Sequence, residues 1–357
     1  MMKKNFSKAL YMAALLCLVG CAKVHTPGPN EANKREFKAW MEINYPDIDP
    51  SGLGIYVLDK TPGTGVEVTD KGLALLDYRI MDLEGNITSY TDARTAEQLG
   101  KYTKTAYYGP RFQTTYKTTL AAGFGEALSG MKVGGTMDVI VPSWLMTARE
   151  FENEQGYLDF YDEGDSPSYT DTRYQFKVVD FTENIDQWQI DSIGRFFRNQ
   201  DVKIFTQPAD VVFDGMTSID TVTTNGFYYK QLIAPAAGAK EFPKDTTIYI
   251  NYTGKLLNGL VFDTNVERVA RENYLYSKSK SYVPVQINWG EAYKDITMGS
   301  SESSVIEGFA LTLWQMKAME KGVGVFYSNL GYGASGSGNS IPGYAPLIFE
   351  IEIVAKP

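Results

Sequence analysis

The chain has 357 residues, of which 43% are hydrophobic and 22% charged, so it is long enough for two folded domains of ordinary composition. Its formal net charge is −9 and no basic patch stands out, which argues against a nucleic-acid partner. The only histidine, His25, lies in a Pro/Gly-rich stretch, so histidine-based catalysis and histidine-ligated metal sites are excluded. Twenty-four tyrosines favour strands over helices.

The N-terminus has the features of an export signal. Lys3, Lys4 and Lys8 flank an apolar run over residues 9–19. That run is shorter than the roughly 20 residues that a membrane-spanning helix needs, and it is typical of a secretory signal. Cys21 follows Leu-Val-Gly, as at a bacterial lipoprotein processing site. We therefore predict that residues 1–20 are removed and that Cys21 carries the lipid.

Residues 21–33 are predicted to be a flexible tether between this lipid and the folded body. No Asp follows Cys21, which in enteric-type sorting favours the outer membrane. We expect a protein of the bacterial cell envelope that contacts the membrane through its anchor alone. Whether it faces the periplasm or the outside is left open.

Two stretches of the chain share one order of elements. Each begins with an amphipathic helix pattern and continues into a strand that opens with Gly, an apolar residue and Tyr, at residues 54–56 and 226–228. A second strand with alternating apolar residues follows, and then a turn at Gly85 or Gly259. The residues that define the helices and second strands are Phe37, Trp40, Met41, Leu76, Tyr78 and Ile80, against Ile193, Phe196, Phe197, Ile248, Ile250 and Tyr252.

A further helix and a closing strand complete each stretch. Ser304 and Glu307 predict a capping box for the helix of the second stretch. The closing strands contain Phe176 and Phe349. Duplication of one unit accounts for these patterns better than two unrelated domains do. The helix residues are Phe124, Ala127, Leu128 and Met131, against Ile306, Phe309, Ala310, Leu313 and Met316.

The fold class that follows is α+β. We expect two units, each a curved antiparallel sheet wrapped on one short helix. The predicted boundaries are 34–181 for the first domain, 182–221 for a linker that contains a helix, and 222–357 for the second domain.

Four short segments of the second domain combine aromatic, apolar and glycine residues in a fixed order. They are Tyr252-Thr253-Gly254 running to Phe262-Asp263, Val305-Ile306-Glu307-Gly308-Phe309, Gly331-Tyr332-Gly333, and Ile341-Pro342 leading to Leu347-Ile348-Phe349-Glu350. In order, spacing and residue type they resemble the FKBP-type peptidyl-prolyl cis-trans isomerases. The resemblance covers about residues 50–181 and 222–355, and it is strong only in the second of these ranges.

The resemblance implies an apolar pocket that needs no cofactor or metal. It makes Phe309 the floor beneath the proline ring of the substrate, and it makes the Ile306 backbone N–H and the Tyr332 hydroxyl donors to substrate carbonyls. Asp263 is expected to bond to Tyr252 or to line the rim opposite the twisting carbonyl. The aromatic walls would be Tyr252, Phe262 and Phe349, the rim Val305 and Ile306, and the flap residue Ile341.

The second domain departs from the family pattern at Val285, where an aromatic residue is common, and at Ser337, where histidine is common. Two insertions, at about 265–283 and 291–304, flank the predicted pocket. They extend the pocket rim or cover it. The first is rich in Tyr, Lys, Arg and Ser, and it either contacts the client chain or is a solvated excursion.

The first domain keeps the frame but lacks the site. Tyr78, Phe124 and Phe176 are the expected counterparts of Tyr252, Phe309 and Phe349, and Met146 lies near the position of Tyr332. An acidic segment over residues 149–171, predicted to be a solvated loop, replaces the flap. We expect this domain to be inactive, and either to bind clients or only to space and stabilise the second domain.

The expected function is that of a peptidyl-prolyl isomerase and folding helper for proline-containing envelope proteins. The alternative is a non-catalytic lipoprotein that binds peptides or proteins in the same frames. A third possibility is a purely structural lipoprotein.

Overall fold

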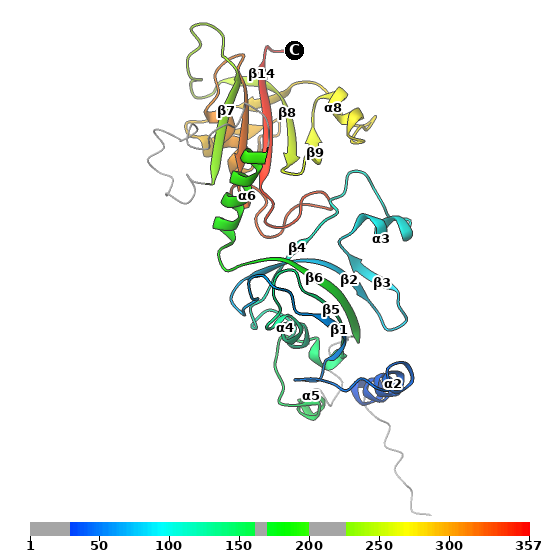
Figure 1. The fold of residues 1–357 in the computed structure, drawn as a ribbon. Coiled ribbons are helices and arrows are strands. Elements are labelled where there is room, and N and C mark those ends of the chain that lie inside the picture. Colours follow the sequence, from blue (N-terminus) through cyan, green and yellow to red (C-terminus); the bar gives the residue numbers. More distant parts are fainter. Residues whose placement is uncertain (1–28, 161–169, 200–225) are drawn as a thin grey trace, which may run out of the picture.

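The computed structural model describes residues 29–160, 170–199 and 226–357. The predicted signal segment and Cys21 lie outside these residues. Two antiparallel sheets, one in each half, form the main body of the protein (Figure 1). We refer to residues 56–182 as the N-terminal unit and to residues 227–354 as the C-terminal unit.

The sheet of the N-terminal unit has the strand order β1-β5-β6-β2-β3, with β4 also paired to β2. Helix α4 (Ala122–Leu128) packs against β5 and buries Phe124 and Leu128. The strands are β1 (Tyr56–Thr61), β2 (Leu73–Met81), β3 (Ile87–Tyr90), β4 (Arg111–Thr114), β5 (Thr136–Val141) and β6 (Thr172–Thr182).

The sheet of the C-terminal unit has the order β12-β11-β10-β8-β14-β13-β7, with β9 also paired to β8. Helix α9 (Glu307–Trp314) lies against β13 and β14. The strands are β7 (Phe227–Ile233), β8 (Thr247–Leu256), β9 (Val261–Thr264), β10 (Val285–Asn288), β11 (Thr297–Met298), β12 (Ser303–Ser304), β13 (Lys321–Phe326) and β14 (Leu347–Val354).

The two sheets repeat one topology, because β1, β5, β6, β2, β3 and β4 correspond in order to β7, β13, β14, β8, β9 and β10. Leu73 pairs with Thr114 as Thr247 pairs with Asn288, so equivalent residues in this region differ by 174 in number. Between β5 and β13 the difference is 185, and between β6 and β14 it is 175. The predicted α+β class, with a sheet wrapped on one helix in each unit, is confirmed.

This register shows which predicted insertion is an addition to the repeated frame. Residues 265–283 match residues 91–109 one for one, so the N-terminal unit has the same segment. The added residues of the C-terminal unit fall in the second predicted insertion, residues 291–304, which contains a 3₁₀ turn (Tyr293–Asp295) and the short strands β11 and β12.

The core of the C-terminal unit lies between the concave face of its sheet and α9. Alternation along β8 buries Ile248, Ile250 and Tyr252 on that face, as the period of a strand requires. From α9, Phe309 and Leu313 complete the layer. These residues belong to one continuous hydrophobic cluster.

Two local predictions were wrong. The first turn of α9 has no capping box, because its N-cap is Ile306 and the Glu307 carboxylate instead accepts a 2.8 Å hydrogen bond from the Tyr293 hydroxyl. The acidic segment is not only a solvated loop, because α5 (Glu154–Phe160) forms within it and buries Tyr157.

The remaining helices lie outside the sheets. Helix α2 (Pro29–Asn44) buries Phe37 and Met41 against β5. Its first five residues, 29–33, fall within the predicted tether, and proline favours the first helical position because its φ is already helical. The other helices are α3 (Ala93–Gln98) and α8 (Glu267–Glu272), at equivalent places in the two units, and α6 (Ile185–Asn199). No described helix is long and apolar enough to cross a membrane.

Helix α6 joins the two units and contacts both. The Trp188 indole N–H donates to Asp180 of β6 at 2.8 Å. On the other side, the Gln189 side-chain oxygen accepts a 2.7 Å bond from the Ser328 backbone N–H. Ile193 and Phe197 are buried in the core of the C-terminal unit. The helix predicted within the linker is therefore part of that unit's packing.

Candidate active site

The floor of the predicted pocket is a group of aromatic rings in edge-to-face contact. The Phe309 ring lies 5.7 Å from that of Tyr252 and 5.1 Å from that of Phe349, both nearly perpendicular. Phe262 meets Phe349 edge-on at 5.6 Å. Phe309, Tyr252 and Phe349 are buried, whereas Phe262 is half-buried. Edge-to-face packing of this kind fixes ring orientation as well as burying area.

Helix α9 delivers the floor and the rim from one turn. Ile306 is its N-cap residue, with extended backbone angles, and Phe309 follows three residues later. The amides at a helix N-terminus have no partner within the helix and point away from it. Val305 and Ile306 are half-buried and pack on the edge of the aromatic cluster.

Gly254 makes room for Phe262 and Phe349. A Cβ at this position would lie 2.4 Å from the Phe262 ring and 3.1 Å from the Phe349 ring. Gly254 pairs with both Asp263 of β9 and Phe349 of β14. The absence of a side chain here lets the two rings close together over β8.

Asp263 is held from two sides. The Tyr252 hydroxyl donates to its Oδ2 at 2.6 Å, and the Lys280 ammonium lies 2.5 Å from its Oδ1. Burial, followed by the charge of Asp263, raises the pKa of Tyr252, so the phenol remains a donor. The first of the two roles expected for Asp263, a bond to Tyr252, is the arrangement that the structure shows.

The flap, residues 331–346, brings Tyr332 and Ile341 to the same cluster. Tyr332 is half-buried, and burial followed by the charge of Asp263 raises its pKa. Ile341 is buried and exchanges two backbone hydrogen bonds with Ser337. Gly336, with φ +63°, allows this turn, because a Cβ there would lie 2.2 Å from the Ile341 carbonyl oxygen.

All nine residues predicted from the sequence therefore meet in one place. Eight belong to the hydrophobic cluster or pack against it, and Asp263 joins them through Tyr252. Val285 also packs on this cluster from β10. Their catalytic and binding roles remain predictions. The nine are Tyr252, Phe262, Asp263, Val305, Ile306, Phe309, Tyr332, Ile341 and Phe349.

One counterpart assigned to the N-terminal unit, Phe176, was wrong by two residues, and Met146 lies one residue from the position that matches Tyr332. Tyr78 pairs with Phe176, whereas Tyr252 pairs with Ile351, so the residue that matches Phe349 is Tyr174. The difference of 185 that relates β5 to β13 also relates the following 3₁₀ turns, Ser143–Leu145 and Ser328–Leu330. Thr147, rather than Met146, therefore matches Tyr332.

Lys280 is the site residue that the sequence prediction missed. At the difference of 174, Asp263 corresponds to Ser89 and Lys280 to Ala106. The unit that has the carboxylate also has the ammonium, and the other unit lacks both. Comparison of the two halves residue by residue is the signal that would have identified this ion pair.

Comparison with known proteins finds FKBP-type relatives. The family model for FKBP-type peptidyl-prolyl cis-trans isomerases matches residues 238–354. The chain is 32% identical over 126 residues to FK506-binding protein 1A of Aspergillus fumigatus, covering 35% of this chain and 90% of that protein. It is 30% identical over 115 residues to an FK506-binding protein of Neisseria meningitidis, covering 32% of this chain and 84% of that protein.

A probable FKBP-type isomerase of Haemophilus influenzae is 33% identical over 133 residues, a match that spans 37% of this chain and 43% of that relative. The match to the family model coincides with the C-terminal unit, which contains the aromatic floor, the Tyr252–Asp263 bond and the flap. The chain belongs to the FKBP-type peptidyl-prolyl cis-trans isomerase family.

Proposed function

We propose that the C-terminal unit isomerises X–Pro bonds in proline-containing client chains and so assists their folding. The observation that carries this proposal is the arrangement of a buried aromatic floor beneath a half-exposed ring of donors and rim residues. Such a site can take in a proline ring while it holds the flanking peptide at the surface. Known ligand sites have the same character, mostly apolar with few directed polar groups.

Isomerisation of an X–Pro bond requires little beyond an apolar pocket of this kind. Rotation about the X–Pro bond must break amide resonance, with a barrier of about 18–20 kcal/mol. In the twisted state the nitrogen lone pair no longer feeds the carbonyl, so the amide is less charge-separated than in the planar state. An apolar floor of Phe309, Tyr252 and Phe349 therefore stabilises the twisted amide more than the planar one, which is differential binding of the transition state.

The polar groups of the site orient the substrate. The Tyr332 hydroxyl is held in its protonated form by burial, and it is available to donate to a substrate carbonyl. The Ile306 N–H, at the N-terminus of α9, is the second proposed donor. Asp263 already binds Tyr252 and Lys280. We therefore propose that it fixes the orientation of the Tyr252 ring and places a negative charge at the edge of the pocket.

We assign no isomerase activity to the N-terminal unit. The Tyr174 ring stacks on Phe124 at 4.6 Å with the two planes within 26°, whereas the matching rings of Phe349 and Phe309 meet edge-on at 5.1 Å. The unit has Thr147 at the position of Tyr332 and Ser89 at the position of Asp263. It therefore lacks both the edge-to-face packing of the Phe309–Phe349 pair and the polar groups of the other site.

The test is a cis-to-trans relaxation assay on a short X-Pro-Phe peptide with the full chain. We expect acceleration in proportion to protein concentration, abolished or strongly reduced by Phe262→Ala. The matched substitution Thr88→Ala, at the equivalent position of the N-terminal unit, should leave the rate unchanged. A rate equal to that of buffer would refute the catalytic proposal, and peptide binding without acceleration would instead support the non-catalytic alternative.

We also propose that the protein is anchored to an envelope membrane through Cys21. The support is the sequence alone, in the apolar run of residues 9–19 and the Leu-Val-Gly-Cys junction. In a bacterial host, Cys21→Ser should move the protein from the membrane fraction to the soluble fraction, whereas Cys17→Ser should not. Continued membrane association of the Cys21→Ser protein would contradict the anchor.

A further inference from the structure

Residues 102–108 of the N-terminal unit, here called the tyrosine loop, have a counterpart at residues 276–282. The rings of Tyr102 and Tyr108 stack at 5.2 Å, and those of Tyr276 and Tyr282 stack at 5.4 Å. In each loop the hydroxyl of the second tyrosine accepts a hydrogen bond from the N–H of the residue after the first, at 3.0 Å and 2.9 Å. Both units therefore project a loop closed by the same pair of rings.

The two loops serve different partners. The loop of the C-terminal unit turns to its own site, where Lys280 pairs with Asp263. The tyrosine loop of the N-terminal unit has lost that pair and contacts the C-terminal unit instead. The Lys104 ammonium lies 3.8 Å from the centroid of the Tyr274 ring. The Tyr107 N–H donates to the Asn339 carbonyl at 2.8 Å.

These contacts fall on two sides of the proposed site. Tyr274 follows α8, in the segment that also supplies Lys280. Asn339 belongs to the flap and lies two residues before Ile341. Lys104 and Tyr107 are three positions apart in the sequence, a span of at most about 11 Å. The tyrosine loop therefore bridges Tyr274, in the segment after α8, and the flap, and Figure 1 shows the chain after α3 rising to this position.

The Tyr107 side chain anchors the bridge. Its ring is half-buried and packs on the core of the C-terminal unit, although the residue belongs to the N-terminal one. Its hydroxyl donates to the Pro110 carbonyl at 3.1 Å. The tyrosine loop is thus attached to the C-terminal unit by the packing of the Tyr107 ring and by the backbone hydrogen bond from Tyr107 to Asn339 of the flap.

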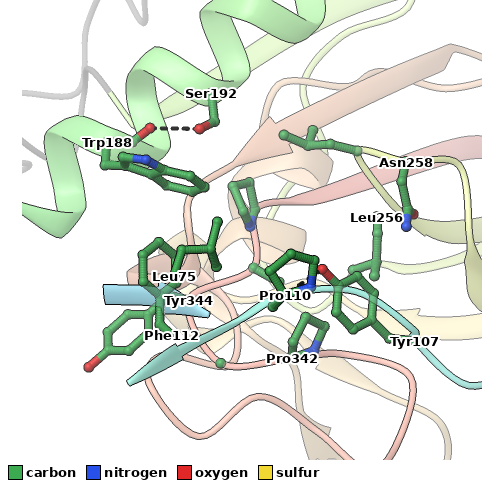
Figure 2. Close-up of a pocket in the computed structure, with 14 residues that line it drawn as sticks. Leu75, Tyr107, Pro110, Phe112, Trp188, Ser192, Leu256, Asn258, Pro342 and Tyr344 are labelled. Atoms are coloured by element: carbon green, nitrogen blue, oxygen red, sulfur yellow. Dashed lines mark hydrogen bonds between the residues drawn. The ribbon is translucent and has the colours of Figure 1, made fainter. Parts of the chain in front are cut away.

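Behind the flap the two units are not fully packed. A cavity of about 200 Å³ opens between the flap residues Pro342 and Tyr344, the N-terminal residues Leu75 and Phe112, and Trp188 of α6 (Figure 2). Phe112 touches Tyr344 edge-on at 5.7 Å on one side of this space. On this side, therefore, the Tyr107 N–H bond to Asn339 and the Phe112–Tyr344 contact are two separate contacts of the N-terminal unit with the flap.

We propose that Lys104 and Tyr107 are positioning residues for the isomerase site of the C-terminal unit. They hold the flap and the segment after α8 at a fixed separation and so place Tyr332 and Ile341 for catalysis. This inference rests on the proposed function. It gives the N-terminal unit a task, since a unit without a site of its own completes the site of its neighbour.

The first test measures the flap without reference to activity. Ser337 and Ile341 exchange backbone hydrogen bonds within the flap, so hydrogen exchange of their amides reports its opening. In the full chain, Lys104→Ala with Tyr107→Ala should speed this exchange about fivefold and leave the amides of β14 unchanged. The conservative pair Lys104→Arg with Tyr107→Phe should restore the slow exchange. The matched control is Lys278→Ala with Ser281→Ala, at the equivalent positions of the other loop, and it should have no effect.

The second test is kcat/KM on the X-Pro-Phe peptide with the same proteins. We expect a threefold to tenfold loss for the alanine pair, and recovery in the conservative pair. Unchanged flap exchange and unchanged kcat/KM in the alanine pair would overturn the proposal. A rise in kcat/KM would also overturn it, because the loop would then obstruct the site. A third outcome separates the two proposals. If the wild-type chain has no isomerase activity but the alanine pair still speeds hydrogen exchange in the flap, the proposed function is refuted, while the role of Lys104 and Tyr107 in positioning the flap is supported.

Discussion

The Tyr252 hydroxyl donates a 2.6 Å hydrogen bond to Oδ2 of Asp263 and so ties the aromatic floor of the pocket to its polar rim. The two residues lie on neighbouring strands, β8 and β9, and the bond fixes the Tyr252 ring against Phe309. One interaction thus sets both the shape of the floor and the position of the negative charge.

Removal of this bond should weaken the fold and the site together. Tyr252→Phe keeps the ring but leaves Asp263 with Lys280 and the Thr264 backbone N–H as its partners among the described contacts. We expect a loss of about 1.5–3 kcal/mol in the free energy of unfolding, the usual contribution of a hydrogen bond to a charged group. Urea unfolding measures it, with Tyr78→Phe at the equivalent position as the control. Equal stability of Tyr252→Phe and wild type would show that the bond contributes nothing.

The Tyr332 hydroxyl should contribute to rate and not to folding. Tyr332→Phe removes the proposed donor to the substrate, whose net value of about 0.5–1.5 kcal/mol corresponds to a twofold to tenfold loss in kcat/KM. Thr147→Ala, at the equivalent position of the N-terminal unit, should have no effect on kcat/KM. An unchanged rate for Tyr332→Phe, with an intact thermal transition, would remove Tyr332 from the mechanism.

Activity should be independent of pH between about 6 and 9. Burial raises the pKa of Tyr332 above its usual value near 10, with Asp263 as a second cause, so the hydroxyl keeps its proton throughout this range. Because the folded-state pKa is raised, the stabilisation linked to the neutral phenol is complete below the unfolded-state pKa. It is lost as the pH rises through the folded-state value. A pH–rate profile with an inflection between 6 and 9 would reveal a titrating group that this mechanism does not contain.

Two flap glycines offer a matched pair of substitutions. Gly336 and Gly338 both have positive φ, +63° and +53°, but only at Gly336 would a Cβ meet the Ile341 carbonyl, at 2.2 Å. Gly336→Ala must displace Ile341 and should lower kcat/KM by about tenfold or more, as expected for a misplaced site residue. Gly338→Ala meets nothing within 4 Å and should change kcat/KM by less than about threefold. Equal effects of Gly336→Ala and Gly338→Ala on kcat/KM would show that the position of Ile341 does not affect catalysis.

The repeated frame could be predicted because its strands and helices have periodic hydrophobic patterns. The residues of the site could be predicted because they occur in a fixed order along the chain. Alternation along β8 and helical spacing along α9 follow from burial on one face. The assignment of Phe176 failed because Tyr174 and Phe176 share one face of β6 and both are buried. A strand period of two does not distinguish them, and the bulge between Leu75 and Leu76 helps to set which residue meets β2.

Other features depend on contacts between segments distant in the sequence. Glu307 lost its capping role to a bond with Tyr293, which comes from the added residues 291–304. Lys280 pairs with Asp263, and Tyr107 bonds to the flap. In both cases the sequence of the loop does not indicate which distant residue it contacts. Loops of this kind are polar and solvent-facing, so hydrophobic periodicity gives no information on their partners.

The most direct test of the central claim is two-dimensional exchange NMR on a short X-Pro-Phe peptide, with the full chain at a small fraction of the peptide concentration. We predict that the cis-to-trans and trans-to-cis rates rise by the same factor and that the cis:trans ratio does not change, because a catalyst lowers one barrier for both directions. Phe262→Ala should return both rates towards those of free peptide. Rates that stay at the uncatalysed values, with or without line broadening from binding, would contradict the assignment of this site as an isomerase.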